Sequence, residues 1–447
     1  MAKVVDQFIE IAKKRNPSEP EFIQTVEEVM ESIAPVLDKY PVYVDSGVVE
    51  RLIEPERQIM FRIPWVDDSG KPQVNRGYRV QFNSAIGPYK GGTRFHPSVN
   101  LGVIKFLAFE QIFKNALTPL PIGGGKGGAD FDTRGKSDGE IMRFCQSFVS
   151  ELFRHIGPDT DSPAGDIGVG GREIGYMFGQ YKRLSDTYNC AITGKGVGWG
   201  GSLARTEATG YGIVYFADEM LKANGASMKG VTVASSGFGN VTWGMASKAT
   251  ELGAKIITIS GPDGYVHDPD GVLGEKIDYL LDLRGSGQDI VAPYADKFGS
   301  ATFYPKEKPW GVKADVVIPC ATQNEIHLDD AKKIVANGTK FVCEGSNMPT
   351  TNEALKYLQD NKVIVGPAKA ANAGGVATSA LEMAQNSMRY YWTFDEVDGK
   401  IKQIMVDIFK SCESAAKEFG MEGNYVAGAN VAGFLKVAKA MLAQGIV

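Results

Sequence analysis

One lysine stands among glycines in the segment 121–131, which reads Pro-Ile-Gly-Gly-Gly-Lys-Gly-Gly-Ala-Asp-Phe. Because glycine has no Cβ, the backbone around Lys126 can adopt positive φ and a ligand can approach it closely. We interpret the segment as a loop that holds a cation at the end of a pocket. It does not match the phosphate-binding pattern G-x-x-x-x-G-K-[ST], since Gly127 follows the lysine. The alternative is a flexible surface turn, although such turns usually carry Ser and Asn as well.

More polar residues precede this segment. Lys90 lies in the glycine-rich segment 87–92, and Gln111 and Lys114 share one face of a helix predicted over 101–117. Lysines are usually solvated and isolated, yet two of the three lysines described so far sit in glycine-rich turns. The cluster therefore favours convergence on an anionic ligand over a solvated basic face.

A carboxylate follows in a third glycine-rich segment, 163–173. Asp166 lies ahead of a helix that begins near Arg172, and by itself it is typical of an N-cap or turn aspartate. It becomes a candidate catalytic residue because proton transfer at Lys126 needs a carboxylate that faces the lysine.

The elements that must position these residues differ between the two halves of the chain. Residues 1–55 have the spacing of amphipathic helices, and the alternating segments 58–65 and 75–82 predict an antiparallel hairpin. A boundary is predicted near residue 200, in the glycine-rich segment 194–201.

Beyond that boundary, a helix over 208–223 precedes a strand–turn–helix–strand unit. The strand 230–236 runs into Gly237-Phe238-Gly239-Asn240, and a second strand covers 255–260. This context favours a dinucleotide site, with the pyrophosphate at the helix N-terminus. Thr242 takes the place of the third glycine, so helix and strand should pack slightly farther apart.

Three further strands predict a parallel, doubly wound sheet with a ligand at the carboxyl ends of its strands. They cover 314–320, 340–344 and 362–365. Two helices, 401–419 and 426–444, end the sequence, and the last one has an apolar face that should dock on a core.

Composition restricts the class of protein. A chain of 447 residues is too long for one core, and a net charge of −5 argues against nucleic acid or an anionic membrane as partner. Five scattered cysteines indicate buried thiols in a reducing compartment, and four histidines without metal spacing predict no metal site. With no signal core and no 18-residue apolar run, we expect a cytoplasmic protein.

Together these motifs resemble those of hexameric bacterial glutamate dehydrogenases, and the resemblance covers essentially the whole chain. The matching segments are 87–92, 121–131, 163–166, 200–203, 207–212 and 373–375. The resemblance implies an α/β fold with two domains. Residues 1–200, completed by the C-terminal helix 425–447, would be a substrate-binding and oligomerisation domain, and 201–424 a Rossmann-type dinucleotide-binding domain. Small departures occur at Thr93, Ser162 and Thr206.

The resemblance also implies the roles of residues. Lys126 would be the catalytic lysine and Asp166 the carboxylate that moves protons beside it. The implied substrate residues are Lys90, Gln111, Lys114, Gly165 and Ser379, and Thr209 and Asn240 match cofactor positions. The implied partners are L-glutamate, 2-oxoglutarate and ammonium, in a homohexamer.

The residue types suit that reaction. Each carboxylate of glutamate needs a cation, which we assign as Lys114 with Gln111 at the α-carboxylate and Lys90 with Ser379 at the γ-carboxylate. Crowding by the other two lysines and partial desolvation should lower the pKa of Lys126.

For the cofactor we predict NAD over NADP. Asp263, after the second strand, would repel a 2′-phosphate but could accept bonds from ribose hydroxyls, and Phe238 adds apolar bulk in the turn. The alternative is that Asp263 merely caps a turn. The predicted cofactor residues are Thr209, Gly237, Phe238, Gly239, Asn240, Asp263 and Asn347.

Two other functions use parts of the same pattern. A dehydrogenase for leucine, valine or phenylalanine would keep Lys126 and Asp166 but has no need of Lys90 and Ser379. A non-catalytic nucleotide-binding regulator would keep the glycine turn after the strand but has no need of three pocket lysines and Asp166.

Overall fold

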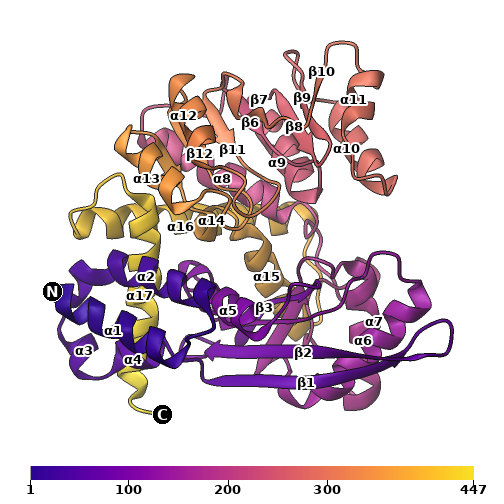
Figure 1. The fold of residues 1–447 in the computed structure, drawn as a ribbon, viewed down its shortest axis with the longest axis vertical. Coiled ribbons are helices and arrows are strands. Elements are labelled where there is room, and N and C mark those ends of the chain that lie inside the picture. The colour runs from indigo at the N-terminus through magenta and orange to yellow at the C-terminus, as the bar shows by residue number, and fades with distance from the viewer. Residues whose placement is uncertain (1) are drawn as a thin grey trace. The chain divides into compact units, whose positions relative to one another are not determined.

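The computed structural model describes residues 2–447. The chain forms two compact units (Figure 1). The first unit comprises Met1–Leu203, Val376–Thr393 and Asn430–Val447, and the second comprises Ala204–Gly375 and Phe394–Ala429. This confirms an α/β protein with two parts.

The first unit is built on a five-stranded mixed sheet in the order β1-β2-β4-β3-β5. Its strands are β1 (Arg57–Val66), β2 (Pro72–Asn83), β3 (Tyr89–Phe95), β4 (Gly123–Ala129) and β5 (Asp161–Gly165). β1 and β2 form the predicted antiparallel hairpin, which gives the two longest arrows of this unit in Figure 1. β4 pairs antiparallel to β2 and parallel to β3, and β3 is parallel to β5.

The prediction that the glycine-rich segments around Lys90 and Lys126 are turns or loops was wrong. Lys126 lies in β4 and Lys90 in β3, and all seven residues of β4 are buried. No glycine of β4 has positive φ. Close packing, not turn geometry, requires glycine here. A Cβ on Gly91, for example, would lie 1.6 Å from the carbonyl oxygen of Gly125 on the neighbouring strand.

Helices cover both faces of this sheet. α5 (Leu101–Leu117) coincides with the predicted helix and packs on one face, where Cβ atoms on Gly124 and Gly128 would lie within 3 Å of Ile112 and Ile104. α6 (Asp138–Leu152) and α7 (Gly171–Ser185) share a core with strand residues on the other face. The predicted N-terminal helices are α1 (Ala2–Arg15), α2 (Pro20–Lys39), α3 (Val42–Asp45) and α4 (Val48–Leu52).

The second unit contains the predicted doubly wound parallel sheet, in the order β13-β12-β11-β6-β7. Its strands are β6 (Thr232–Ser235), β7 (Lys255–Ile256), β11 (Val316–Ile318), β12 (Phe341–Cys343) and β13 (Ile364–Gly366), with helices α8 (Ala208–Ala223), α9 (Asn240–Glu251), α12 (Leu328–Ala336), α13 (Asn352–Asp360), α14 (Ala368–Ala371) and α16 (Phe394–Glu418). From β6 the chain moves outward to β7 on one side and later to β11 on the other. The direction therefore reverses between β6 and β11, which is where open α/β sheets bind ligands.

The second predicted strand of this unit is divided in two. β7 ends at Ile256, and β8 (Thr258–Gly261) joins β9 (Gly264–His267) and β10 (Thr302–Pro305) in a separate antiparallel sheet. The hydroxyl of Thr258 accepts from the N–H of Ser235 and donates to its carbonyl, both at 2.8 Å, in place of ladder bonds with β6. α10 (Glu275–Gly285) and α11 (Ala292–Lys297) lie in the connection between β9 and β10.

Two helices contribute to both units. α15 (Gly374–Met388) begins in the second unit, but Val376–Thr393 belongs to the first, although the sequence interpretation assigned it to the second domain. The reason is a set of polar contacts: Gln385 donates to Ser202 Oγ at 2.8 Å and Asn386 to the carbonyl of Gly200 at 2.7 Å.

α17 (Tyr425–Gln444) is the second such helix, and it joins the first unit from Asn430 onward. By length and composition alone it could cross a membrane, although the sequence analysis expected no apolar run of 18 residues. Its apolar face is instead packed in the first unit. Val431, Phe434 and Val437 are fully buried, and the ring of Phe434 meets Tyr43 edge-on with centroids 5.5 Å apart.

Candidate active site

Strand register brings the predicted catalytic residues onto one face of the first unit's sheet. β3 pairs with β4 so that Lys90 lies beside Gly124 and Arg94 beside Gly128. Side chains alternate along a strand, and paired residues of adjacent strands point to the same face. Lys90, Arg94 and Lys126 therefore share the face that α5 covers, and α5 carries Gln111 and Lys114.

Lys126 and Asp166 meet directly. Lys126 Nζ lies 2.9 Å from Asp166 Oδ1, and Arg94 Nε donates to the other carboxylate oxygen at 2.7 Å. The three side chains are 5%, 14% and 12% exposed, so the pair is shielded but still reachable. Gly92 lies between them: a Cβ there would be 3.3 Å from Lys126 Nζ and 2.9 Å from Asp166 Cβ. Only glycine leaves room for this ion pair.

The surroundings adjust the proton affinities of both groups. Burial lowers the pKa of Lys126 below its ordinary value, against the opposing effect of Asp166, and the charges of Arg94 and Arg79 lower it further. The direction agrees with the sequence expectation, but the strongest neighbouring cations are arginines rather than Lys90 and Lys114. For Asp166, burial would raise the pKa, yet the charges of Lys126 and Arg94 outweigh it and hold this pKa well below its usual range.

A second ion pair lies on the opposite face of the same strands. The guanidinium of fully buried Arg79 makes a bidentate contact with the fully buried carboxylate of Asp161, with Nε 2.8 Å from Oδ2, and donates to the carbonyl of Gly91 at 3.1 Å. Cβ atoms on Gly125 and Gly127 would lie 3.6 Å and 3.1 Å from the Arg79 side chain. The glycines of β4 thus make room for α5 on one face and for Arg79 on the other.

The residues predicted for the distal carboxylate also lie in the first unit. Lys90 is fully buried, and its Nζ donates to the carbonyl of Ser162 at 2.8 Å and to Thr193 Oγ1 at 2.7 Å. Ser379 is 2% exposed, in the part of α15 that belongs to this unit.

The residues predicted for the α-carboxylate lie on α5. Gln111 Nε2 donates to Asn115 Oδ1 at 2.7 Å, and Asn115 Nδ2 donates to the carbonyl of Lys90 at 3.0 Å, which ties the helix to β3. Lys114 is half-buried in the last turn of α5. Gly165 ends β5, and a Cβ there would lie 2.5 Å from the carbonyl oxygen of Val169 in the turn that presents Asp166.

Sequence reasoning assigned no role to Arg94 or Thr193. The alternation of Lys90, Gly92 and Arg94 along one strand face could have indicated Arg94, had the segment been interpreted as a strand. Nothing in the local sequence indicates Thr193, since its contact with Lys90 spans more than 100 residues.

In the second unit, the turn after β6 has the features of a dinucleotide site. Gly237 has φ +78°, and a Cβ there would lie 2.7 Å from Thr242 Oγ1 and 3.0 Å from the carbonyl of Cys320, which follows β11. Gly239 precedes α9 with open space where its Cβ would be, and none of the described side chains caps the start of this helix. This arrangement fits a pyrophosphate on the N-terminus of α9. Thr242 is buried and donates to the carbonyl of Ser236 at 3.1 Å.

The other predicted cofactor residues surround the same end of this sheet. Thr209, at the start of α8, lies against Gly375, where a Cβ would be 2.5 Å from its hydroxyl. Asn347 accepts a hydrogen bond from Asn372 at 2.9 Å. Asp263 lies in the turn between β8 and β9, and its carboxylate accepts the N–H groups of Val291 and Ala292, at 2.9 Å to 3.0 Å. Asp263 therefore fixes the start of α11, whereas the alternative interpretation expected it to cap a turn.

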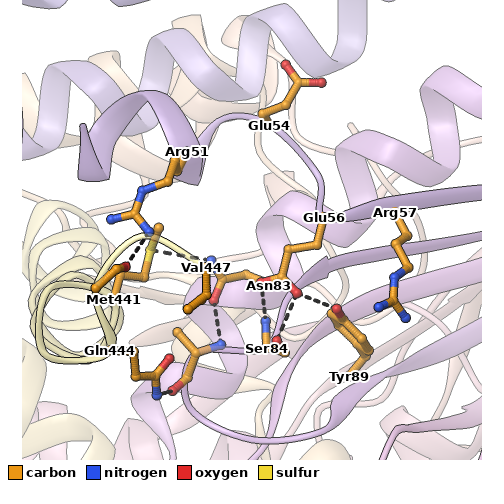
Figure 2. A pocket seen from close by; sticks show the side chains of 12 residues that line it. Arg51, Glu54, Glu56, Arg57, Asn83, Ser84, Tyr89, Met441, Gln444 and Val447 are labelled. Carbon is orange, nitrogen blue, oxygen red and sulfur yellow. Dashed lines mark hydrogen bonds between the residues drawn. The ribbon is translucent and has the colours of Figure 1, made fainter. Parts of the chain in front are cut away.

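A cavity of about 440 Å³ lies elsewhere in the first unit (Figure 2). Its lining includes Arg51, Arg57 and Glu56, and the hydroxyl of Tyr89 donates to the Glu56 carboxylate. Burial and this bond raise the pKa of Tyr89 to about 12. None of the predicted catalytic or substrate residues lines it, so it is not the candidate active site.

Comparisons with known proteins identify the family. Residues 200–445 match the family Glutamate/Leucine/Phenylalanine/Valine dehydrogenase, and residues 55–183 match the Glu/Leu/Phe/Val dehydrogenase dimerisation domain. The NAD-specific glutamate dehydrogenase of Clostridium symbiosum is 58% identical, with 100% of both proteins covered. The NADP-specific glutamate dehydrogenase of Haemophilus influenzae is 56% identical, again over 100% of both. A solved structure of a glutamate dehydrogenase has a TM-score of 0.98 at 57% identity, covering 100% of both chains. The chain belongs to the Glu/Leu/Phe/Val dehydrogenase family.

Proposed function

We propose that the chain is a glutamate dehydrogenase that interconverts L-glutamate with 2-oxoglutarate and ammonium. The observation that carries this proposal is the shielded Lys126–Asp166 pair on the same sheet face as a fully buried Lys90. A buried lysine is costly unless its charge is used. Lys90 has an obvious use in a site for a substrate with a second carboxylate, and none in a site for leucine or valine.

Different residues of the first unit bind the two carboxylates of the substrate. Lys114 and Gln111 on α5 hold the α-carboxylate, and Lys90 and Ser379 hold the γ-carboxylate. Gly92 leaves room for the Lys126–Asp166 pair, and Gly165 allows the close turn that presents Asp166. The substrate therefore lies with its Cα near the Lys126–Asp166 pair.

The chemistry at Cα follows from the two catalytic groups. The Gly237–Gly239 turn, Asn240, Thr209 and Asn347 would hold a nicotinamide dinucleotide, and this group would supply the hydride acceptor for oxidation at the Cα of glutamate. Lys126, whose pKa is lowered by burial, takes a proton from the water as that water attacks the resulting iminium carbon. The carboxylate of Asp166, whose pKa is held low by Lys126 and Arg94, then takes the hydroxyl proton of the carbinolamine and passes it to the departing amine as the carbonyl forms.

Replacing Lys90 by Leu together with Ser379 by Val should raise the KM for glutamate and allow apolar amino acids to react. An unpaired γ-carboxylate in an apolar pocket is costly, whereas a methyl-bearing side chain fits. Steady-state kinetics with glutamate and norvaline measures the change, with the exposed-lysine variant Lys136→Leu as control. An unchanged glutamate KM would mean that other residues hold the distal carboxylate.

For the cofactor we propose NAD. The Asp263 side chain lies in the turn after β8, and Phe238 is buried beside it, with a ring atom 3.4 Å from where a Gly261 Cβ would be. Neither favours a 2′-phosphate. Lys306 adjoins this turn through its backbone, because its N–H donates to the Asp263 carbonyl at 2.8 Å.

Replacing Asp263 by Lys and Pro262 by Ser should therefore shift the ratio of kcat/KM values toward NADP. A loss of structure is the competing result, since Asp263 also fixes α11, so Asp263→Asn serves as the control that keeps acceptor oxygen without charge. Should the unmodified protein already use NADP more efficiently, the cofactor proposal fails and Lys306 becomes the residue to replace.

One experiment tests the proposed function as a whole: initial rates with NAD and NADP on glutamate and on leucine. A higher kcat/KM for glutamate supports the proposal, and a higher kcat/KM for leucine identifies an apolar amino-acid dehydrogenase. No turnover with either amino acid would favour the non-catalytic nucleotide-binding regulator. We further propose a homohexamer. Its support is the matched dimerisation domain and the exposed Met60 and Val66 on β1, an edge strand of its sheet.

A further inference from the structure

A fully buried ion pair in the first unit takes no part in the chemistry described above. Lys195 and Glu382 both have side chains with no exposed surface, and Lys195 Nζ lies 2.8 Å from Glu382 Oε1. They come from distant parts of the sequence: Lys195 follows the loop after α7, and Glu382 lies on α15. Burying two charges this completely is expensive, and replacing such a pair by apolar residues often stabilises a protein. Stability alone therefore explains the pair poorly.

The polar atoms of the pair are fully used. Lys195 Nζ also donates to the carbonyl of Ile192 at 2.7 Å and contacts Cys190 Sγ at 3.3 Å, which accounts for all three of its protons. Glu382 Oε2 accepts the N–H of Gly194 at 2.9 Å, and Oε1 accepts the N–H of Lys195 at 3.3 Å. The Glu382 carboxylate thus accepts hydrogen bonds from two consecutive backbone N–H groups and from the Lys195 ammonium. This fixes the backbone of 190–195 against one turn of α15.

That segment holds the partner of Lys90. Thr193 Oγ1, which accepts from Lys90 Nζ, lies between Ile192 and Gly194, both of which bond to the ion pair. The same segment is tied to β5, because the N–H of Thr193 donates to the carbonyl of Pro163 at 2.9 Å. Lys90 is therefore positioned through Thr193 by the pair.

Ser379, the second residue proposed for the γ-carboxylate, lies on the same helix as Glu382. Ser379 and Glu382 are three residues apart on α15, so they share one helix face. Fixing Glu382 fixes the turn that carries Ser379. Thr193 and Ser379 belong to segments about 190 residues apart in the sequence, and the Lys195–Glu382 contact spans 187 residues to join them.

We propose that Lys195 and Glu382 are positioning residues that set the spacing between Lys90 and Ser379, and with it the selectivity of the site for a substrate with a distal carboxylate. The proposal rests on the proposed function, since it concerns the same site. It assigns neither residue a contact with substrate.

The test compares two substrates that differ only at the distal group. Glutamate carries a γ-carboxylate, and norvaline carries a methyl group in its place. The variants are Lys195→Met, Glu382→Gln and the double variant Lys195→Met with Glu382→Leu. The matched control is Lys105→Met, which removes another buried lysine of the first unit, 3% exposed and paired with Glu19 at 3.1 Å, but lying away from Thr193 and α15.

We expect each pair variant to lower kcat/KM for glutamate by about 10²-fold, mainly through KM, because a displacement of about 1 Å at a binding group costs this much. Norvaline kcat/KM should change by less than about 3-fold. The double variant should recover thermal stability, since no unpaired charge remains buried, without recovering glutamate selectivity. Lys105→Met should leave the glutamate-to-norvaline ratio unchanged.

Two results would overturn the proposal. One is an equal loss with both substrates, which would make the pair a general stabiliser. The other is an unchanged glutamate KM in a folded double variant. If the unmodified protein shows no preference for glutamate over norvaline, the proposed function has failed, and this result is read before any variant is made.

Discussion

Replacing Lys126 by Ala is expected to lower kcat by about 10²–10⁴-fold, the usual effect of removing a general acid–base group. Arg94 also contacts the Asp166 carboxylate, but a guanidinium stays protonated and cannot exchange protons in place of the lysine. Cofactor binding should survive, because Lys126 belongs to the first unit and the Gly237–Gly239 turn to the second. Steady-state rates with glutamate and a calorimetric titration with NAD measure the two effects separately.

The control for this change is Lys136→Ala, which removes an exposed lysine a few residues after β4. It should leave both the rate and the NAD titration as they are. Near-native turnover of the Lys126→Ala protein would remove Lys126 from the mechanism and, with it, the proposed role of Asp166.

The second large effect is on stability. Replacing Asp161 by Ala should reduce the free energy of unfolding by about 3–5 kcal/mol, because it leaves the guanidinium of Arg79 buried without its counter-charge. Arg79 would keep only the carbonyl of Gly91 as a partner. A denaturant titration followed by circular dichroism gives the change in midpoint.

The double variant Arg79→Met with Asp161→Leu separates charge from shape. It removes both charges and should recover most of the lost stability. The exposed pair Asp132–Arg134 is the matched control, since Asp132→Ala should barely move the midpoint. If Asp161→Ala moves the unfolding midpoint as little as Asp132→Ala, the Arg79–Asp161 ion pair does not stabilise the sheet.

The sequence was sufficient where local signals and tertiary structure agree. α5 and α8 have the predicted bounds, because their apolar spacing and their packing favour the same helix. β3 and β4 were interpreted as turns, because glycine is unfavourable in strands and favourable in turns. Their strand conformation is fixed by packing that the local pattern of residues does not record: α5 lies on one face and Arg79 on the other.

The same limit applies to the site. Residue types indicated that Lys90, Lys126 and Asp166 belong together, and the geometry of the first unit agrees with that prediction. The sequence did not indicate which charged residues lie beside Lys126. The charges of Arg94 and Arg79 lower the pKa of Lys126. Strand register brings Arg94 close to Lys126, and Arg79 approaches because its side chain extends from β2 across β4 toward Asp161. Neither arrangement leaves a pattern in the local sequence.

The glycines of β3 and β4 also determine how this site could be found by experiment. A scan that replaces each residue by alanine measures function by deletion, and at Gly91, Gly92, Gly125 and Gly127 it would add an atom instead. Such a scan would score these positions as damaged packing and attribute the site to its lysines alone. The close packing that glycine permits around the lysines is as much a part of the catalyst as the charges, and only an insertion series, from alanine to larger side chains, would map it.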